Sequence, residues 1–349
     1  PSIDCVVPSR WKEVVIVSVR SVLSFAGIVI VALAIAAYSL FSPGAGQDSA
    51  ALWSVATNPN STDFAATVVW QWRAPRVVAA IVVGMCLGIA GAIFQILTHN
   101  PLGSPDIIGF NTGAYTGVIA VSLAGFSSAF NIALGAFVGG TVTALLIMGL
   151  SFAGRLTGAR LIVVGIGVTF FLSAINKWLI LSGELEQSLG AATWAAGTLN
   201  AVSWGYVIPL GVLGGVACVA GLLLRGWCDA LALGDSTASS LGLNVNRARV
   251  VMVLVGTVLV AVSTAIAGPI SFIALAAPHM ARLLSRPGRT PVLASGVLGA
   301  LFLLAADLAG QRLFFPITLP AGLVTVCAGG IYLAGLLLWQ SRFARVKGR

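Results

Sequence analysis

Long apolar segments separated by short polar connections make up almost the whole chain. A membrane helix needs about 20 apolar residues to cross the hydrocarbon core. Ten segments fit this description, at residues 21–41, 77–97, 107–125, 127–153, 160–182, 205–225, 248–267, 271–285, 292–310 and 321–340, although 271–285 is short for a full crossing. The pattern predicts an all-α polytopic membrane protein with a single transmembrane domain over residues 1–349.

Glycines recur at four-residue spacing in several of these segments. The recurrences are Gly84–Gly88, Gly109–Gly113–Gly117 and Gly135–Gly139. Residues four apart lie on one helix face, so glycines at this spacing let two membrane helices approach closely. Tight helix packing is the favoured interpretation, and lining of a transport pathway is the alternative.

One polar connection, over about residues 229–247, is longer than a turn between two membrane helices requires. Its residues predict a small helix over 236–241, with Asp235 as the N-cap and Gly242 at the end. Asn246 is the expected cap of the next apolar segment. A folded projection of this kind indicates a surface on which a partner docks.

When the ten segments are threaded in order, three of the connections on the opposite side of the membrane are longer than a few residues. They are the residues of about 42–76, 182–204 and 311–320. The second of them is expected to form a short helix that dips back towards the membrane.

Composition and charge support the membrane class and exclude another. Of the 349 residues, 58% are hydrophobic and 8% are charged, which is too apolar for a soluble domain of this size. The net charge of +9 would suit nucleic acid, but threading places most of the 19 basic residues on one side of the membrane. By the positive-inside rule that side is the cytoplasm. Both termini are therefore expected in the cytoplasm, and no nucleic-acid partner is expected.

The sequence lacks the signatures of common enzymes. It contains no G-x-x-x-x-G-K-[ST], no H-E-x-x-H and no C-x-x-C motif. Its two histidines, His99 and His279, are too few for a multi-histidine metal site. We therefore expect no catalytic residues, no metal and no cofactor bound by this chain.

Lys177 and Asp307 are the charged residues inside the predicted spans. A charge there costs roughly 2.5–3.5 kcal/mol on insertion, so each is a functional candidate. Asp307 is interpreted as structural, either holding the end of its helix or orienting Arg312. Lys177 either extends to the outer interface or touches an anionic substrate. One acid is too few for the several midplane acids typical of an ion-coupled secondary transporter, which stays the alternative class, with a non-transporting scaffold as a further one.

Three arginines, Arg73, Arg76 and Arg312, fall on the outer side, where the positive-inside rule disfavours them. The planar, permanently charged guanidinium group suits carboxylates. These residues are expected either to anchor the interface beside Trp70 and Trp72 or to contact an acidic protein or anionic solute that docks outside.

A series of motifs in order along the chain resembles the FecCD-type permeases of ABC importers for iron siderophores, haem and cobalamin. The motifs are Trp72-Arg-Ala-Pro-Arg76, Gly91-Ala-Ile-Phe-Gln95, Asn100-Pro-Leu-Gly-Ser-Pro-Asp106, Gly109-Phe-Asn-Thr-Gly113, Leu233-Gly-Asp235, Gly268-Pro-Ile-Ser-Phe272, Pro278-His-Met-Ala-Arg282 and Leu319-Pro-Ala-Gly322. The run from Asn100 to Gly113 resembles most the permease subunits for ferric enterobactin, a catecholate siderophore. Another iron chelate, haem or cobalamin is the alternative cargo.

The resemblance implies a type II ABC importer permease in a bacterial cytoplasmic membrane. Its expected partners are a homologous second permease in a heterodimer, two ATPase subunits that use ATP and Mg²⁺, and an extracytoplasmic substrate-binding protein. The fifth and tenth helices, with residues 184–204, are expected to gate the pathway.

The same resemblance assigns roles to residues of this chain. Coupling to the ATPase is expected at Leu233, Gly234, Asp235, Ala238, Leu241 and Gly242. Docking of the binding protein is expected at Arg73, Arg76 and Arg312. Candidates for the pathway of the ferric siderophore are Asn176, Lys177 and Trp194, for which packing or interfacial anchoring is the alternative. Lys177 departs from the neutral polar residue that the family leads us to expect.

Overall fold

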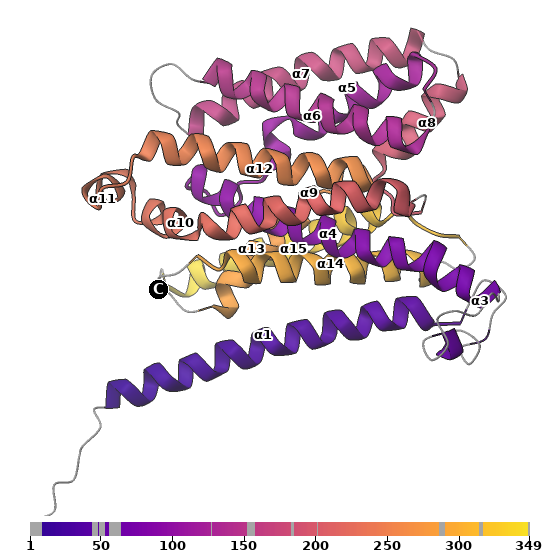
Figure 1. Ribbon diagram of the computed structural model, residues 1–349. Coiled ribbons are helices and arrows are strands. Elements are labelled where there is room, and N and C mark those ends of the chain that lie inside the picture. Colours follow the sequence, from indigo (N-terminus) through magenta and orange to yellow (C-terminus); the bar gives the residue numbers. More distant parts are fainter. Residues whose placement is uncertain are drawn as a thin grey trace, which may run out of the picture.

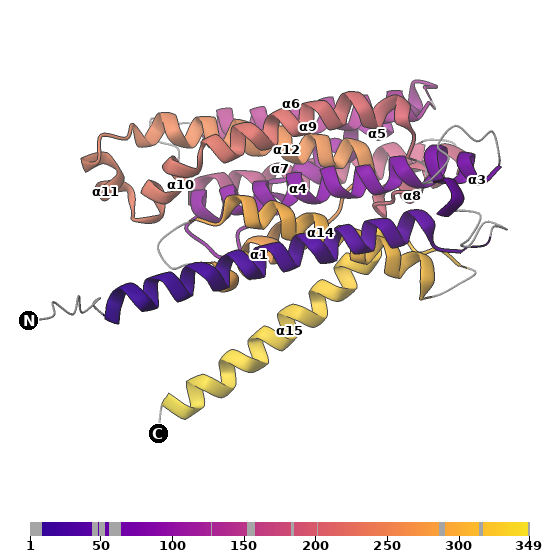
Figure 2. The same ribbon diagram turned by 60° about the horizontal axis from the view of Figure 1, so that its bottom comes forward.

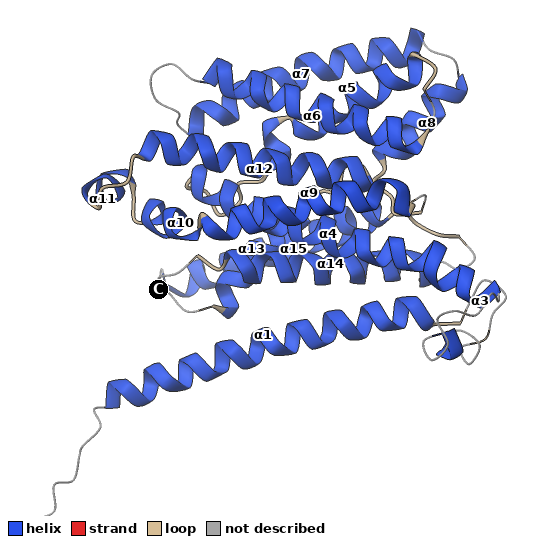
Figure 3. Ribbon diagram, viewed as in Figure 1, coloured by secondary structure: helices blue, strands red, loops and turns tan. Residues whose placement is uncertain are grey.

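A computed structural model describes residues 9–43, 48, 53–55, 64–126, 128–151, 158–182, 185–200, 202–285, 290–313 and 317–347. Every regular element in these ranges is a helix, and they contain no strand (Figure 3). The expected all-α class is therefore confirmed. Parts of the three outer connections, including position 184, lie outside the described residues.

Each of the ten predicted segments coincides with a helix. The helices are α1 (Ser9–Phe41), α4 (Ala74–Leu97), α5 (Phe110–Leu123), α6 (Ala129–Ser151), α7 (Gly158–Ser182), α9 (Trp204–Leu223), α12 (Val245–Ala267), α13 (Ile273–Leu284), α14 (Val292–Arg312) and α15 (Ala321–Lys347). Among the described helices, seven are long and apolar enough to cross a membrane. The exceptions are α5 with 14 residues, α13 with 12, and α15, of which the described apolar stretch is Ala321–Gly335.

Helix α4 lies in the middle of the bundle, where α9, α12, α13 and α14 pack around it (Figure 1). Its most apolar stretch is 78% buried. A methyl group on Gly88 would overlap the carbonyl oxygen of Ser295, and one on Gly84 would overlap that of Gly299. Backbones this close leave no space for a side chain. The predicted glycine packing is confirmed here, and also between α5 and α6, where Gly117 faces α6 in the same way.

Each end of the bundle carries its own pair of short helices. One end, which we call the α11 end, carries the short helices α10 (Arg225–Ala232) and α11 (Asp235–Ser240). The opposite end, the α8 end, carries α3 (Phe64–Thr67) and α8 (Leu185–Ala195) (Figure 1). Helix α8 lies in the connection 182–204, which confirms the short helix expected there.

Helix α4 is entered at the α8 end through the π-helix η1 (Val68–Arg73). Pro75 lies in the first turn of α4 and has no backbone N–H, so the regular ladder is interrupted there. The N–H of Ala74 instead reaches back to the oxygen of Val69. One continuous helical stretch from Phe64 to Leu97 results, with Arg73 and Arg76 in its half towards the α8 end.

Three backbone segments meet at the α8 end with no side chain between them. We call this contact the glycine junction; it joins the loop after α8, the break between α12 and α13, and the start of α15. The N–H of Gly322 donates to the oxygen of Gly197, and that of Thr198 to the oxygen of Ala267, both at 2.8 Å. Gly197 has a φ of +68°, and a side chain there would overlap the oxygen of Pro269. The junction therefore requires glycine at this position.

Helices α1 and α15 lie at the edge of the molecule. Figure 2 shows α15 diverging from the bundle towards the C-terminus, while α1 crosses the outside of the bundle. The most apolar stretch of α1 is 6% buried, and that of α7 is 17% buried. These helices leave wide apolar faces for lipid or for another membrane chain.

Replacing Gly88 by alanine is expected to destabilise the protein, because the added methyl group forces α4 and α14 apart. Overpacking of this kind costs about 1–3 kcal/mol, and thermal unfolding in detergent measures it. Gly149→Ala in α6 is the control, since nothing lies within 4 Å of its added methyl group. Equal unfolding midpoints for the two variants would contradict a tight contact between α4 and α14.

Candidate functional site

The polar segment 229–247 contains the projecting helix that its sequence predicts. Helix α11 stands out at its end of the bundle (Figure 1) and stops at Gly242, which has a φ of +84°. The N–H of Gly242 donates to Ser239 at 3.0 Å, and that of Leu243 to Ala238 at 3.1 Å. These two bonds satisfy the last carbonyl groups of the helix. Ala238 is fully buried and is the residue through which α11 rests on the bundle.

Two predictions about caps in this segment are wrong. Gly234, with a φ of +98°, is the N-cap of α11, and Asp235 is the first helical residue. The Asp235 carboxylate instead accepts two bonds from Nη2 of Arg249, at 2.9 and 2.8 Å. Asn244, and not Asn246, caps α12 through its side-chain oxygen. A charged partner in the neighbouring helix thus outweighs the local cap for Asp235.

The residues around α11 combine an ion pair with exposed apolar side chains. Arg249 lies in the first turns of α12 with its side chain 10% exposed, whereas that of Asp235 is 48% exposed. Leu233 and Leu241 flank α11 and are 65% and 66% exposed. The structure thus brings the six predicted coupling residues together in one projection. The preceding helix α10 was not among the predicted elements.

Arg73 and Arg312 both bind the C-terminal end of α1. Arg73 Nη1 donates to the carbonyl oxygens of Leu40 and Ser42, at 2.9 and 2.6 Å. Arg312 Nη2 donates to the Ser42 hydroxyl and, at 2.9 Å, to the oxygen of Pro43. The last carbonyl groups of a helix carry the negative end of its dipole, which favours cations there. These two arginines therefore hold α1 against the bundle.

Arg76 forms an ion pair with Asp307 that joins α4 to α14. Arg76 Nη2 lies 2.7 Å from Oδ1, and Nε lies 2.8 Å from Oδ2. The side chains are 16% and 5% exposed, and Gln311 donates a further bond to the carboxylate at 2.8 Å. Asp307 therefore pairs with Arg76, and the interpretation in which it orients Arg312 is wrong.

The three pathway candidates do not share one exposed surface. Asn176 on α7 is 3% exposed, and its Nδ2 donates to the oxygen of Thr112 on α5 at 3.3 Å. Lys177 is exposed and points away from that contact. Trp194 on α8 is half-buried and stacks on Tyr115 of α5, with ring centroids 6.1 Å apart. The contacts of Asn176 and Trp194 suit packing on α5, and Lys177 alone faces outward.

Asp106 forms a polar link at the start of α5 that the sequence analysis did not single out. It lies in the 3₁₀ turn η2 (Pro105–Ile108) and accepts from Asn111 Nδ2 at 2.8 Å and from the Ser104 hydroxyl at 3.1 Å. Asn111 in turn accepts from the Thr264 hydroxyl on α12 at 3.3 Å. Burial raises the pKa of Asp106 to about 6, although the two hydrogen bonds to its carboxylate oppose this shift.

Replacing Asp307 by asparagine is expected to destabilise the protein by about 3–5 kcal/mol, because Arg76 is left with a buried, uncompensated charge. Thermal unfolding in detergent measures this loss. The double variant Arg76→Gln/Asp307→Asn removes both charges and should be more stable than Asp307→Asn alone. A single variant as stable as the parent protein would contradict a buried pair.

The raised pKa of Asp106 predicts a pH-dependent stability. Between about pH 4 and 6 the folded chain keeps a proton on Asp106 that the unfolded chain has released, so stability falls as the pH rises through this window. The loss from pH 5 to 7.5 should be about 1 kcal/mol. Asp106→Asn cannot titrate and should lack this component. The unfolding midpoints of the parent protein and of Asp106→Asn at the two pH values measure this contribution. The same pH dependence in both proteins would rule out a contribution from Asp106.

Comparisons with known proteins agree with this architecture. A profile of the FecCD transport family matches residues 19–339. The ferric enterobactin transport system permease protein FepG of Escherichia coli (strain K12) is 48% identical over 275 residues, which are 79% of this chain and 83% of that protein. The hemin transport system permease protein HmuU of Yersinia pestis is 33% identical over 296 residues, 83% and 87% of the two chains.

A solved structure has the same fold. It is a metal-chelate type ABC transporter in an inward-facing conformation, similar with a TM-score of 0.79 and 23% identity over 90% of this chain and 98% of that chain. The fold that the resemblance implied is therefore confirmed. With a family profile matching most of its length, the chain belongs to the FecCD transport family.

Proposed function

We propose that this chain is the transmembrane permease subunit of an ATP-driven importer that brings a ferric siderophore of the enterobactin type into the cytoplasm. The observation that carries the proposal is the 48% identity to FepG over most of both chains. The chain itself binds neither ATP nor Mg²⁺ in this mechanism, because both belong to a separate ATPase.

The projecting helix α11 is the proposed contact with that ATPase. Leu233 and Leu241 expose apolar side chains at a polar end of the bundle, where burial against a partner is favourable. The ion pair of Asp235 with Arg249 ties α11 to α12, so a force on α11 reaches a helix whose most apolar stretch is 72% buried. The α11 end, with both chain termini, then faces the cytoplasm.

The α8 end is the proposed contact with an extracytoplasmic binding protein. Of the three outer arginines, Arg312 is exposed although it also donates to Ser42 and Pro43, whereas Arg73 and Arg76 are partly buried and bound to Leu40, Ser42 and Asp307. Arg312 is therefore the residue best placed to meet an acidic group on the binding protein. Arg73 and Arg76 support this surface by fixing α1 and α14.

A second, homologous permease is the proposed partner within the membrane. Helices α7 and α15 expose apolar residues such as Phe170, Phe171 and Ile331, with exposures of 73%, 67% and 76%. Two such subunits enclose a pathway between them, and Lys177 is the proposed contact with an anionic cargo because it is the outward-facing pathway candidate.

Purification of the chain from gently solubilised native membranes, followed by mass spectrometry, tests the proposed assembly. Recovery of an ATPase and a second permease of this family is expected. The recovered complex is then placed in proteoliposomes and supplied with the binding protein and ferric enterobactin. Uptake should require internal ATP and persist when ion gradients are collapsed. Uptake driven by a gradient without ATP would overturn the proposal in favour of a secondary transporter.

Reversing one charge of the Asp235–Arg249 ion pair is expected to uncouple ATP hydrolysis from transport. Asp235→Arg and Arg249→Asp each place like charges together and should lower uptake per ATP hydrolysed about tenfold or more. The double variant restores an ion pair of opposite polarity and should regain part of the coupling. Siderophore uptake and phosphate release, measured in the same proteoliposomes, give the ratio of substrate taken up to ATP hydrolysed. Single variants that keep the parent ratio would argue against this link.

A further inference from the structure

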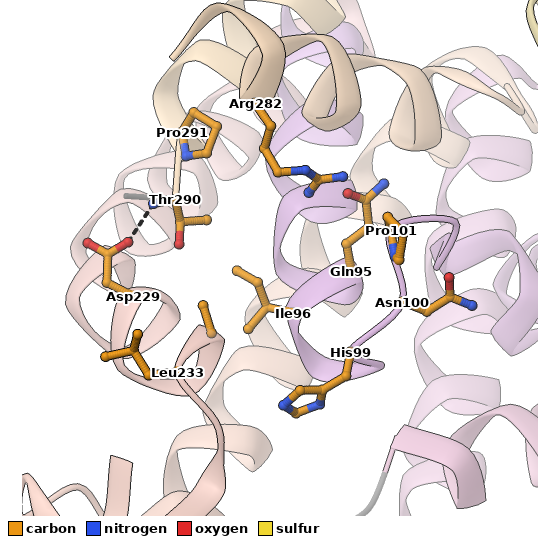
Figure 4. A pocket seen from close by; sticks show the side chains of 11 residues that line it. Gln95, Ile96, His99, Asn100, Pro101, Asp229, Leu233, Arg282, Thr290 and Pro291 are labelled. Atoms are coloured by element: carbon orange, nitrogen blue, oxygen red, sulfur yellow. Dashed lines mark hydrogen bonds between the residues drawn. The ribbon is translucent and has the colours of Figure 1, made fainter. Parts of the chain in front are cut away.

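A cavity of about 430 Å³ opens beside α10 at the α11 end (Figure 4). Its walls come from α10, from the last turn of α4 with the loop that follows, from α13 and from the start of α14. Gln95 and Arg282 lie on one side of it, and Asp229 and Thr290 lie on the other (Figure 4). The cavity adjoins the projection that carries α11, since Leu233 lines it, but Gln95, Arg282 and Thr290 belong to none of the sites described above.

Gln95 brings an unsatisfied acceptor to this cavity. The side chain is 4% exposed, and its Nε2 donates to the oxygen of Leu275 at 3.2 Å. Among the described residues, nothing donates a hydrogen bond to its Oε1. A buried carbonyl oxygen without a donor is costly, so a ligand that offers an N–H or O–H group gains affinity here.

Arg282 brings a cation to the same wall. Among the described residues it forms no ion pair. The carboxylate across the cavity is already used, because Asp229 Oδ1 accepts from the Thr290 N–H at 2.6 Å and Oδ2 lies 3.9 Å from Arg225 Nε. Arg282 and Gln95 thus offer a positive charge and an unsatisfied acceptor to a ligand, beside the polar side chains of His99, Asn100 and Thr290.

These two groups select a kind of ligand. A guanidinium group binds a carboxylate best, and an amide oxygen requires a donor. A fully deprotonated anion such as sulfate, or a phosphodiester, satisfies Arg282 but offers no donor to Gln95. A peptide segment with an acidic side chain satisfies both, because its carboxylate meets Arg282 while a backbone N–H meets Gln95.

The position of the cavity indicates where such a segment comes from. Leu233 lines the cavity and also flanks α11, where it is 65% exposed. A protein that packs on Leu233 and Leu241 therefore covers the mouth of the cavity.

We propose that this cavity receives an acidic segment of the ATPase, with Arg282 binding its carboxylate and Gln95 accepting from its backbone. The inference rests on the proposed function, which supplies the ATPase. It adds a second contact to α11 and places it directly on the end of α4, the central helix. The ATPase would then hold α10 and α4 together as well as α11.

Binding of the ATPase to the permease pair in lipid nanodiscs tests this contact. Arg282→Gln should weaken binding about tenfold at low salt, because a charge-assisted bond is lost, and Arg282→Lys should weaken it less. Gln95→Glu should weaken it at least as much, since the new carboxylate pairs with Arg282 and repels an acidic segment. The difference in ATPase affinity between the parent protein and Arg282→Gln should become smaller at high salt. Arg160→Gln is the control, because it removes an exposed charge at the start of α7, outside the cavity.

A photo-crosslinking amino acid in place of Thr290 identifies the occupant directly. Mass spectrometry should find adducts with an acidic segment of the ATPase. Adducts with phospholipid instead, or unchanged affinity in both Arg282→Gln and Gln95→Glu, would overturn this inference while leaving the importer intact. Failure of the parent permease pair to bind any ATPase would overturn the proposed function as well.

Discussion

Close backbone contact between α4 and α14 is the constraint on which the rest of this structure depends. Gly84 and Gly88 place the two backbones so near that only glycine fits, and α9, α12 and α13 complete the surround of α4. Both ends of this one helix then border a proposed contact surface. Arg73 and Arg76 lie at its α8 end, and Gln95 lines the cavity at its α11 end. Moving α4 would displace both surfaces together.

Two ion pairs serve opposite ends of the bundle, and they differ in burial. Arg76 and Asp307 are nearly inaccessible and join helices that already pack tightly. Asp235 is half exposed and joins a small projecting helix to a buried one through Arg249. A buried pair mainly specifies which helices meet. A half-exposed pair at a projection can break and re-form at lower cost, which suits a part that moves.

Local patterns in the sequence predicted the elements well, and long-range contacts account for what they missed. Hydropathy located ten helices, and the length and glycines of segment 229–247 indicated α11. No local pattern reveals that Asp307 pairs with a residue 231 positions away. Nor does one reveal that Asp235 pairs with Arg249 and does not cap α11. Asn176 was a pathway candidate because weak contacts from an amide group suit the release of a bulky anion, but its amide donates to the Thr112 oxygen of the same chain. Helix α10 was missed because it follows α9 almost without a break at Leu224.

The glycine junction has a consequence for how α15 can move. Its hydrogen bonds run between backbone atoms of Gly197, Gly322, Thr198 and Ala267, so they do not depend on side chains that rotate away. The first turn of α15 therefore cannot shift without carrying the end of α8 or breaking a bond to it. The far half of α15 stands clear of the bundle. Because α15 is 27 residues long and held near its first turn, a small rotation at the junction would move its C-terminal half much further than its first turn.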